Sequence, residues 1–232
     1  MLILITGASK GIGFETVKQL SQEGTHLIIA VSRNTATLQK LVTTGNSHNV
    51  LPVKADITKA ADLKRLVATI QALNMPLDVL INNAGQIVNK AFEKISAVEL
   101  HAVYNTNVLA PFTLIQKLLP FLQKSKQAHI VNISSMGGFQ GSSKFPGLSA
   151  YSSSKAALSG LTECLAEELK PKGIAVNCLA IGAVQTDMLS KAFPGYKAPL
   201  QPKQMAAYIA DFALRGTTYF NGKIIPVSST TP

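Results

Sequence analysis

The chain has 232 residues, 47% hydrophobic and 15% charged, which excludes a disordered chain and predicts one globular domain over residues 1–232. The net charge of +10 comes from scattered basic residues without a basic run, so a nucleic-acid partner with salt-dependent affinity is not expected. No apolar stretch has the length of a transmembrane helix or a signal-peptide core, so no membrane partner is expected. Cys164 and Cys178 are interpreted as core residues of a reduced, cytoplasmic protein, and no metal site is expected.

Short apolar or β-branched runs alternate with longer segments of helical periodicity. This alternation indicates an α/β fold with parallel strands and helices on both faces of the sheet. Ligands of such sheets bind beyond the carboxyl ends of the strands, so the residues after each strand are the functional candidates. The expected strands are Leu2–Ile5, Leu27–Val31, Val50–Lys54, Val79–Ile81, His129–Ile133, Ala175–Cys178 and Lys223–Val227. The expected helices are Gly13–Glu23, Ala60–Leu73, Ala97–Gln123, Tyr151–Lys170 and Lys203–Leu214, with Pro111 and Pro120 dividing or ending parts of the third.

A glycine-rich turn follows the first expected strand and precedes the first expected helix. Its spacing, G-x-x-x-G-x-G, lets the backbone turn tightly and approach a pyrophosphate, which free N–H groups at a helix N-terminus would bind. Such glycines also serve as ordinary caps, but their position at the start of a βα series favours a dinucleotide site. The residues assigned to this site are Gly7, Ser9, Lys10, Gly11, Ile12 and Gly13.

The end of the second expected strand indicates which dinucleotide is bound. A free ribose 2′-hydroxyl usually meets a carboxylate there, whereas a 2′-phosphate favours arginine. Ser32 and Arg33 stand at this point without a nearby carboxylate, and Lys10 is placed to reach the same phosphate. Either basic residue alone would be interpreted as a solvated surface charge, but the pair favours NADP(H). Asp56 and its neighbour Ile57 are candidates for adenine contact, and Asp56 is equally well explained as a helix N-cap or a turn residue.

Four polar residues are candidates for the chemistry. Tyr151 and Lys155 lie four residues apart, hence on one helical face, where the cation would lower the pKa of the phenol. Ser135 follows a buried strand and is placed to polarise a carbonyl group. Asn107 stands inside a helix, where asparagine is disfavoured, and is either a solvated accident or the holder of a water at a local distortion. Another strand is followed by Asn83, Ala84 and Gly85, which are assigned to the cofactor.

In chain order, these residues resemble the short-chain dehydrogenase/reductase family over essentially the whole chain. The matching pieces are Thr6-Gly7 to Gly11-x-Gly13, Asp56, Asn82-Asn83-Ala84-Gly85, Asn107, Ser135, Tyr151, Lys155, Gly182 and Thr186-Asp187-Met188. The resemblance implies a Rossmann-like doubly wound fold with a seven-stranded parallel sheet. It also implies further cofactor contacts from Gly182, Val184 and Thr186, and a homodimer or homotetramer assembled through the helices at 97–123 and 151–170.

The resemblance further implies an NADPH-dependent oxidoreductase that reduces a ketone or aldehyde to an alcohol. Tyr151 would be the general acid, Lys155 would lower its pKa and hold the nicotinamide ribose, and the cofactor would transfer the hydride. Ser135 would polarise the carbonyl and Asn107 would keep a proton-relay water, while Ser134 supports the strand end. This intact set disfavours the alternative, an NADP(H)-binding regulatory or signalling protein with little turnover.

Three stretches depart from the family pattern. Ile181 replaces the usual proline before Gly182, so the loop that meets the nicotinamide loses a rigid φ. The segment Met136–Ala150 is longer than usual, and Val227-Ser228-Ser229 replaces the Asp-Gly-Gly ending of many members. Ile181 and the C-terminal departure keep the regulatory alternative open.

Substrate contacts are expected from the variable stretches Gln86–Phe92, Met136–Leu148 and Met188–Leu200. Gly137, Gly138 and Gly195 make the flanking loops capable of moving as a lid. The side chains of these stretches indicate an apolar or aromatic carbonyl compound, unless they cover loop cores instead. The candidates are Met136, Phe139, Phe145, Met188, Leu189, Phe193 and Tyr196.

Overall fold

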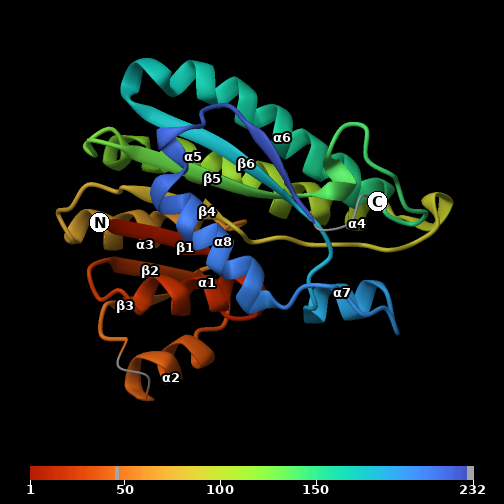
Figure 1. The fold of residues 1–232 in the computed structure, drawn as a ribbon, viewed down its shortest axis with the longest axis horizontal. Helices are drawn as coiled ribbons and strands as arrows, with labels where there is room; N and C mark the ends of the chain where they lie inside the picture. Colours follow the sequence, from red (N-terminus) through yellow and green to blue (C-terminus); the bar gives the residue numbers. More distant parts are fainter. Residues whose placement is uncertain (45–46, 229–232) are drawn as a thin grey trace.

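A computed structural model describes residues 1–44 and 47–228, and this part of the chain forms a seven-stranded parallel sheet (Figure 1). The strand order is β3-β2-β1-β4-β5-β6-β7, so it reverses between β1 and β4, where sheets of this kind bind ligands. The predicted Rossmann-like doubly wound fold is confirmed. The strands are β1 (Leu2–Thr6), β2 (Leu27–Ser32), β3 (Val50–Lys54), β4 (Val79–Asn82), β5 (Ala128–Ser135), β6 (Ile174–Ile181) and β7 (Ile224–Val227).

Within the described residues all five predicted helices are present, one of them divided into α4 and α5, together with two α-helices that were not predicted. The first of the two, α2, is rich in threonine, a poor helix former, and α7 is only six residues long. The α-helices are α1 (Gly11–Ser21), α2 (Ala36–Thr44), α3 (Ala60–Ala72), α4 (Ala97–Tyr104), α5 (Ala110–Leu122), α6 (Ser149–Leu169), α7 (Asp187–Ala192) and α8 (Pro202–Arg215). Short 3₁₀ segments occur at Phe92–Lys94, Met136–Gly138, Lys170–Lys172 and Gly216–Thr218.

Helices cover both faces of the sheet because its central strands are apolar on both sides. Leu4 and its same-face neighbours pack against α3, α5 and α6, whereas Ile5 on the alternate face packs against α1, α2 and α8. In Figure 1, α8 crosses in front of the sheet, and α7 lies beyond the strand ends. Since helices cover both faces of the sheet, a ligand can reach it at the carboxyl ends of the strands.

The predicted helix at 97–123 is divided by a π-helical segment at Asn105–Leu109. Pro111 lies in the first turn of α5, where its missing N–H is tolerated, so this proline divides the stretch as predicted. Pro120 does not end the helix, because α5 continues to Leu122.

The prediction that both cysteines are core residues is correct for one of them. Cys178 on β6 is buried, but Cys164 is exposed on α6. The buried side of α6 includes Thr162 and Ala166, and Cys164 lies on the opposite side, so the apolar neighbours of Cys164 in the sequence are not its neighbours in space.

A buried histidine joins β5 to β6 and α8. His129 is only 1% exposed, its Nδ1 lies 3.0 Å from the carbonyl oxygen of Ala213, and its Nε2 lies 3.1 Å from Nδ2 of Asn177. Because an amide nitrogen only donates, Nε2 is the acceptor and Nδ1 carries the proton. Burial lowers the pKa of His129 to about 4, against the effect of the Ala213 carbonyl, so the ring is neutral in the fold.

We expect this histidine to make the protein sensitive to acid. Since the pKa is about 4 in the fold against 6.5 in the unfolded chain, the unfolded chain binds the proton first as the pH falls. The free energy of unfolding should therefore drop by about 3 kcal/mol between pH 6.5 and pH 4 through this group alone. Urea unfolding at several pH values should show a shallower loss in His129→Gln than in the wild type. The same change at exposed His101 should leave the wild-type pH dependence, and identical slopes in all three proteins would contradict the prediction.

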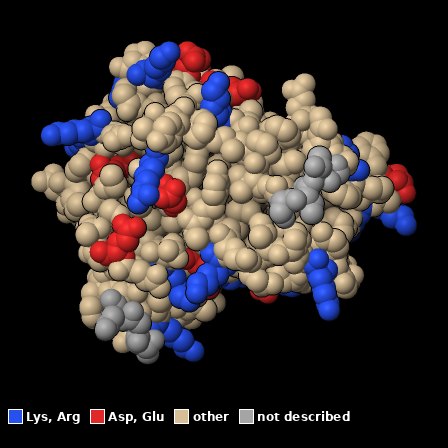
Figure 2. Space-filling view, viewed as in Figure 1, with Lys and Arg blue, Asp and Glu red and all other residues tan. Residues whose placement is uncertain are grey.

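The charges on the face shown in Figure 2 form no single basic patch, since lysines and arginines are interspersed with acidic residues. Within the described residues, none of the helices is both long and apolar enough to cross a membrane. No three His, Cys, Asp or Glu side chains of residues 1–44 and 47–228 gather into a possible metal site.

Candidate active site

A cavity of about 1050 Å³ lies at the carboxyl ends of the strands, across the switch point between β1 and β4. It brings together most of the predicted site residues from six strand ends. Gly182, Val184, Ser135 and Asn107 are not in its lining. The predicted residues that line it are Gly7, Ser9, Lys10, Gly11, Ile12, Gly13, Ser32, Arg33, Asp56, Ile57, Asn83, Ala84, Gly85, Tyr151, Lys155 and Thr186.

The glycine turn is packed so closely that side chains would not fit. Gly7 has a φ of +67°, and a Cβ there would lie 2.8 Å from the Cα of Ala84. A Cβ on Gly13 would clash with the Gly7 carbonyl and the Asn83 amide. That amide donates to the carbonyls of Thr6 (3.0 Å) and Gly7 (3.2 Å), so it fixes the turn to the end of β4. No side chain caps α1 at Lys10, which leaves its first N–H groups available for an anion.

Two basic residues, Arg33 and Lys10, lie at the end of the cavity formed by β2 and the glycine turn. Arg33 is exposed at the end of β2, and the Lys10 ammonium lies 3.8 Å from a carboxylate oxygen of Asp187. Both partners of this pair are well exposed, at 66% and 71%, so it is weak and leaves Lys10 able to bind another anion.

Asp56 is a turn residue and not the N-cap of the helix that follows. Its Oδ1 accepts hydrogen bonds from the amide (3.0 Å) and hydroxyl (2.7 Å) of Thr58, whereas α3 begins later and has Lys59 at its N-cap. Burial works to raise the pKa of Asp56, but these hydrogen bonds and the charges of Arg33 and Lys59 lower it. The position of Asp56 on the cavity wall leaves the adenine contact as a prediction.

Tyr151 and Lys155 point from α6 toward the end of β5. The Ser135 hydroxyl lies beside the Tyr151 hydroxyl, and the Lys155 ammonium lies 5.9 Å from the centre of the Tyr151 ring. Lys155 is only 4% exposed and donates to the carbonyl of Ile133 at 2.7 Å. Burial lowers the pKa of Lys155 to about 8. Burial also raises the pKa of Tyr151, against the lowering effect of the Ser135 hydroxyl, so in this structure desolvation outweighs the lowering that we expected from Lys155.

Asn107 lies at a local distortion of its helix, the π-helical segment. Its side chain is fully buried and is used within the protein, in hydrogen bonds to Gln86 and Ser154. The main-chain carbonyl of Asn107 lacks its usual partner four residues on, because that residue is Pro111, which has no N–H. A water at this residue would therefore bind the carbonyl and not the side chain.

Comparisons with known proteins identify the family. The model of the family described as short chain dehydrogenase matches residues 1–197. The chain belongs to the short-chain dehydrogenase/reductase family. Human dehydrogenase/reductase SDR family member 4 is 32% identical, over 99% of this chain and 86% of the relative. The 3-oxoacyl-[acyl-carrier-protein] reductase FabG of Thermotoga maritima is 31% identical, over 97% of this chain and 94% of the relative.

Solved structures give the same fold with a nicotinamide cofactor in place. ElxO with NADP bound and a Brucella melitensis 3-ketoacyl-(acyl-carrier-protein) reductase with NADH each have a TM-score of 0.86 and 26% identity, over 98% of this chain and 96% of theirs. The protein is thus an oxidoreductase that acts on CH–OH and C=O groups with a nicotinamide cofactor.

The variable stretches of this family member contact one another around the site. Asn89 donates to the carbonyl of Ala192 at the end of α7 (2.7 Å), and the Lys90 amide donates to the carbonyl of Gly147 (3.0 Å). Of the seven predicted substrate side chains only Met188 lines the cavity. The others therefore give no direct support to an apolar substrate.

Gly137 and Gly138 do not form a hinge, contrary to the lid prediction. Both are buried, and a Cβ on Gly138 would lie 2.6 Å from the main chain of Lys155 and Ala156. Their function is close packing against α6. A Cβ on Gly195 would meet nothing within 4 Å, but its φ of +84° requires glycine, so this position serves a turn, and the structure does not test the lid prediction there.

Other departures can also be placed. Ile181 ends β6 and lines the cavity, and Gly182 packs against Ser228, where a Cβ would clash. Val184 is buried and bridges to Leu200, away from the cavity. Ser229, the last residue of the atypical C-terminal sequence, lies outside the described residues.

The sequence interpretation missed several cavity residues. Thr37 and Asn34 were overlooked because α2 was not predicted, although Asn34 accepts from the Ala36 amide and so marks the start of that helix. The Thr37 hydroxyl donates to the Ser9 carbonyl at 2.7 Å and fastens α2 to the glycine turn. Another part of the cavity wall is formed by α4 and the π-helical segment, with Ala102, Asn105 and Thr106.

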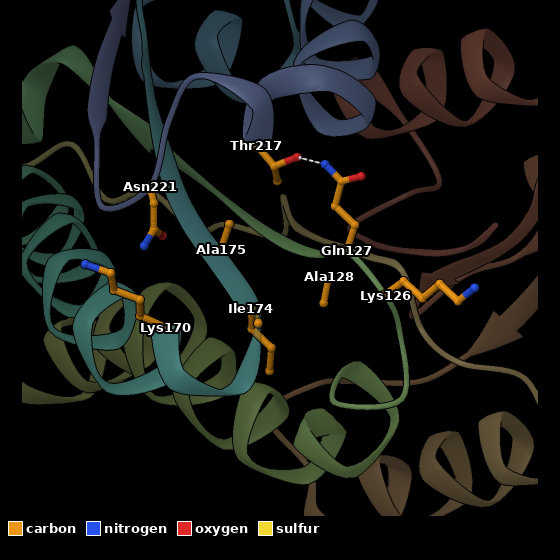
Figure 3. Close-up of a pocket in the computed structure, with 9 residues that line it drawn as sticks. Lys126, Gln127, Ala128, Lys170, Ile174, Ala175, Thr217 and Asn221 are labelled. Atoms are coloured by element: carbon orange, nitrogen blue, oxygen red, sulfur yellow. Dashed lines mark hydrogen bonds between the residues drawn. The ribbon is translucent and has the colours of Figure 1, made fainter.

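A second pocket of about 240 Å³ lies at the opposite, amino ends of β5 and β6 (Figure 3). Gln127 donates to the Thr217 hydroxyl across it at 2.6 Å, and Lys126 and Lys170 point away from each other. Its polar groups do not converge on a common point, so the chemistry belongs to the larger cavity.

Proposed function

We propose that this protein is an NADPH-dependent carbonyl reductase that converts a ketone or aldehyde into an alcohol. The observation that carries the proposal is the placement of Tyr151 beside Ser135, with buried Lys155 next to them, at the edge of a cavity that begins at the glycine turn. The turn supports a dinucleotide because its glycines allow a tight turn packed directly against the end of β4, where a Cβ would clash, and because α1 presents uncapped N–H groups.

The bound nicotinamide would supply the hydride. Tyr151 would donate its hydroxyl proton to the oxygen of the substrate, and the raised pKa of its phenol keeps that proton in place until transfer. Ser135 would donate a hydrogen bond to the same oxygen and so stabilise the negative charge that develops there. The Lys155 ammonium would stabilise the phenolate that remains.

The phosphorylated cofactor is supported by the charges at the end of β2. Arg33 and Lys10 both line the cavity and provide two cations for a 2′-phosphate, and Ser32, directly before Arg33, stands where NAD-binding proteins usually have a carboxylate. Ser9 and Thr37 narrow the same end of the cavity.

The experiment is a titration with NADPH and NADH, followed by nicotinamide fluorescence, on the wild type and Arg33→Ala. We expect the variant to bind NADPH roughly 10- to 100-fold more weakly, because a charge-assisted contact with the phosphate is lost, and to bind NADH unchanged. Arg65→Ala is the matched control, since Arg65 is an exposed arginine on α3 that pairs with Asp62. Equal binding of both cofactors by the wild type would contradict the NADP preference, and binding of neither would contradict the reductase.

We also infer a cytoplasmic homodimer or homotetramer in which the helices α4–α5 and α6 meet between copies. Support comes from the apolar side chains that these helices expose, among them Val98 (77%), Leu109 (56%) and Phe112 (43%). The free thiols of Cys164 and Cys178 support a reducing compartment. The partners that remain expected are a small carbonyl or alcohol substrate and further copies of the chain, without nucleic acid or membrane.

A further inference from the structure

Ser154, between Tyr151 and Lys155 on α6, is fully buried and makes two hydrogen bonds. Its hydroxyl donates to the carbonyl oxygen of Tyr151 at 2.7 Å and accepts from the side-chain amide nitrogen of Asn107 at 2.9 Å. One hydroxyl group thus joins the turn that carries Tyr151 and Lys155 to the π-helical segment.

The other atoms of the Asn107 amide bind the main chain of Gln86. Nδ2 donates its second hydrogen to the Gln86 carbonyl at 2.9 Å, and Oδ1 accepts from the Gln86 N–H at 2.8 Å. Because a backbone N–H only donates and a carbonyl only accepts, these contacts allow a single orientation of the amide. Both amide hydrogens are used, and three segments distant in sequence meet at this one side chain.

The meeting point lies next to the reacting groups. A Cβ on Gly85 would lie 3.6 Å from both the Lys155 ammonium nitrogen and the side-chain oxygen of Asn107. Without the Ser154 hydroxyl, one amide hydrogen of Asn107 would be buried without an acceptor, which is unfavourable enough to make the side chain or the helix turn move. Any such movement changes the position of Gly85 and Gln86 relative to Tyr151 and Lys155.

We propose that Ser154 is a positioning residue for hydride transfer, acting through Asn107. It holds the Tyr151–Lys155 turn, the π-helical segment and the loop after β4 in fixed mutual positions. This inference rests on the proposed function, in which Tyr151 donates a proton to the substrate: the fixed positions of the three segments set the geometry of that transfer.

The neighbouring serine provides a matched control. Ser153 also donates to the carbonyl three residues before it, that of Ala150 at 3.1 Å, but it is exposed and has no hydrogen bond to Asn107. Ser153→Ala therefore removes the same kind of helix contact without the link to the π-helical segment.

The kinetic test compares Ser154→Ala, Ser154→Cys and Ser153→Ala with NADPH and a panel of 4-nitrobenzaldehyde, isatin and ethyl acetoacetate. We expect kcat to fall on the order of tenfold in Ser154→Ala, with NADPH affinity within twofold of the wild type. The pH profile of kcat should shift, because the environment of Tyr151 changes. Ser154→Cys fills the same space with a weak donor and acceptor, so it should be intermediate. Ser153→Ala should match the wild type.

Hydrogen exchange of the Gln86 amide provides a readout that does not require activity. This N–H donates to Asn107, so its exchange should become at least about tenfold faster in Ser154→Ala and stay unchanged in Ser153→Ala. Unchanged exchange at Gln86, or equal kinetics in both alanine variants, would overturn the proposal. A wild type that reduces none of the three compounds would contradict the proposed function, while the exchange measurement would still decide the function of Ser154.

Discussion

Phenylalanine at position 151 should reduce the rate of carbonyl reduction by about 10²- to 10⁴-fold, the usual contribution of a positioned general acid. The ring of Tyr151 would keep its packing on α6, so only the proton donor beside Ser135 would be lost. NADPH binding should remain, because the glycine turn and Arg33 are unaffected. Single-turnover kinetics with NADPH would separate the loss of chemistry from any change in binding.

A matched control for this variant is Tyr208→Phe. Tyr208 lies on α8, stacks on Phe212 with 6.2 Å between ring centres, and does not line the cavity. Its substitution should leave the rate unchanged. If Tyr151→Phe kept more than a tenth of the wild-type rate, another group would have to supply the proton and the proposed mechanism would be wrong.

Gly138→Ala should damage both stability and catalysis. The added methyl would lie 2.6 Å from main-chain atoms of Lys155 and Ala156, which cannot rotate away. The 3₁₀ segment at Met136–Gly138 would have to separate from α6, and Ser135 directly precedes it. We expect a loss of about 1–3 kcal/mol in the free energy of unfolding, and at least a tenfold loss of kcat from the displaced Ser135.

The same substitution at Gly160 should have the opposite sign. Gly160 lies inside α6, and a Cβ there would meet nothing within 4 Å, so alanine should stabilise the helix by about 0.5–1 kcal/mol. Thermal unfolding of both variants, with activity measured at 25 °C, tests the pair. Wild-type stability in Gly138→Ala would show that the segment moves freely, which would restore the lid interpretation of these glycines.

The fold was predictable because its signals are periodic. Strands such as Leu27–Ser32 are continuous apolar runs, and the order of strand, glycine turn and helix at the N-terminus has few alternatives. The candidate site followed from the rule that parallel strands end at one edge, which places Gly7, Arg33 and Ser135 together. These signals are local, and each can be recognised without knowing what packs on it.

What could not be predicted depends on contacts between distant segments. Gly138 looks like a flexible glycine until α6 is found against it, and Cys164 looks buried until the orientation of its helix is known. Ser154 stands in a run of three serines that looks uniform in the sequence, yet only this one meets Asn107. The balance of effects on the pKa of Tyr151 likewise depends on burial, which no spacing of residues reveals.

The π-helical segment has a consequence for how this protein can change during evolution. An α-helix turns by about 100° per residue, so the wider π turn takes up one residue more than the core-facing stripe of α4 and α5 needs. Deleting one residue there would restore regular hydrogen bonding and leave Leu114, Leu118 and Leu122 facing the sheet with Val103 still inward, so the hydrophobic core does not require the wide turn. The irregular turn beside Asn107 is therefore retained by the site and not by the hydrophobic core, and a descendant that lost the activity would be expected to be free to lose it.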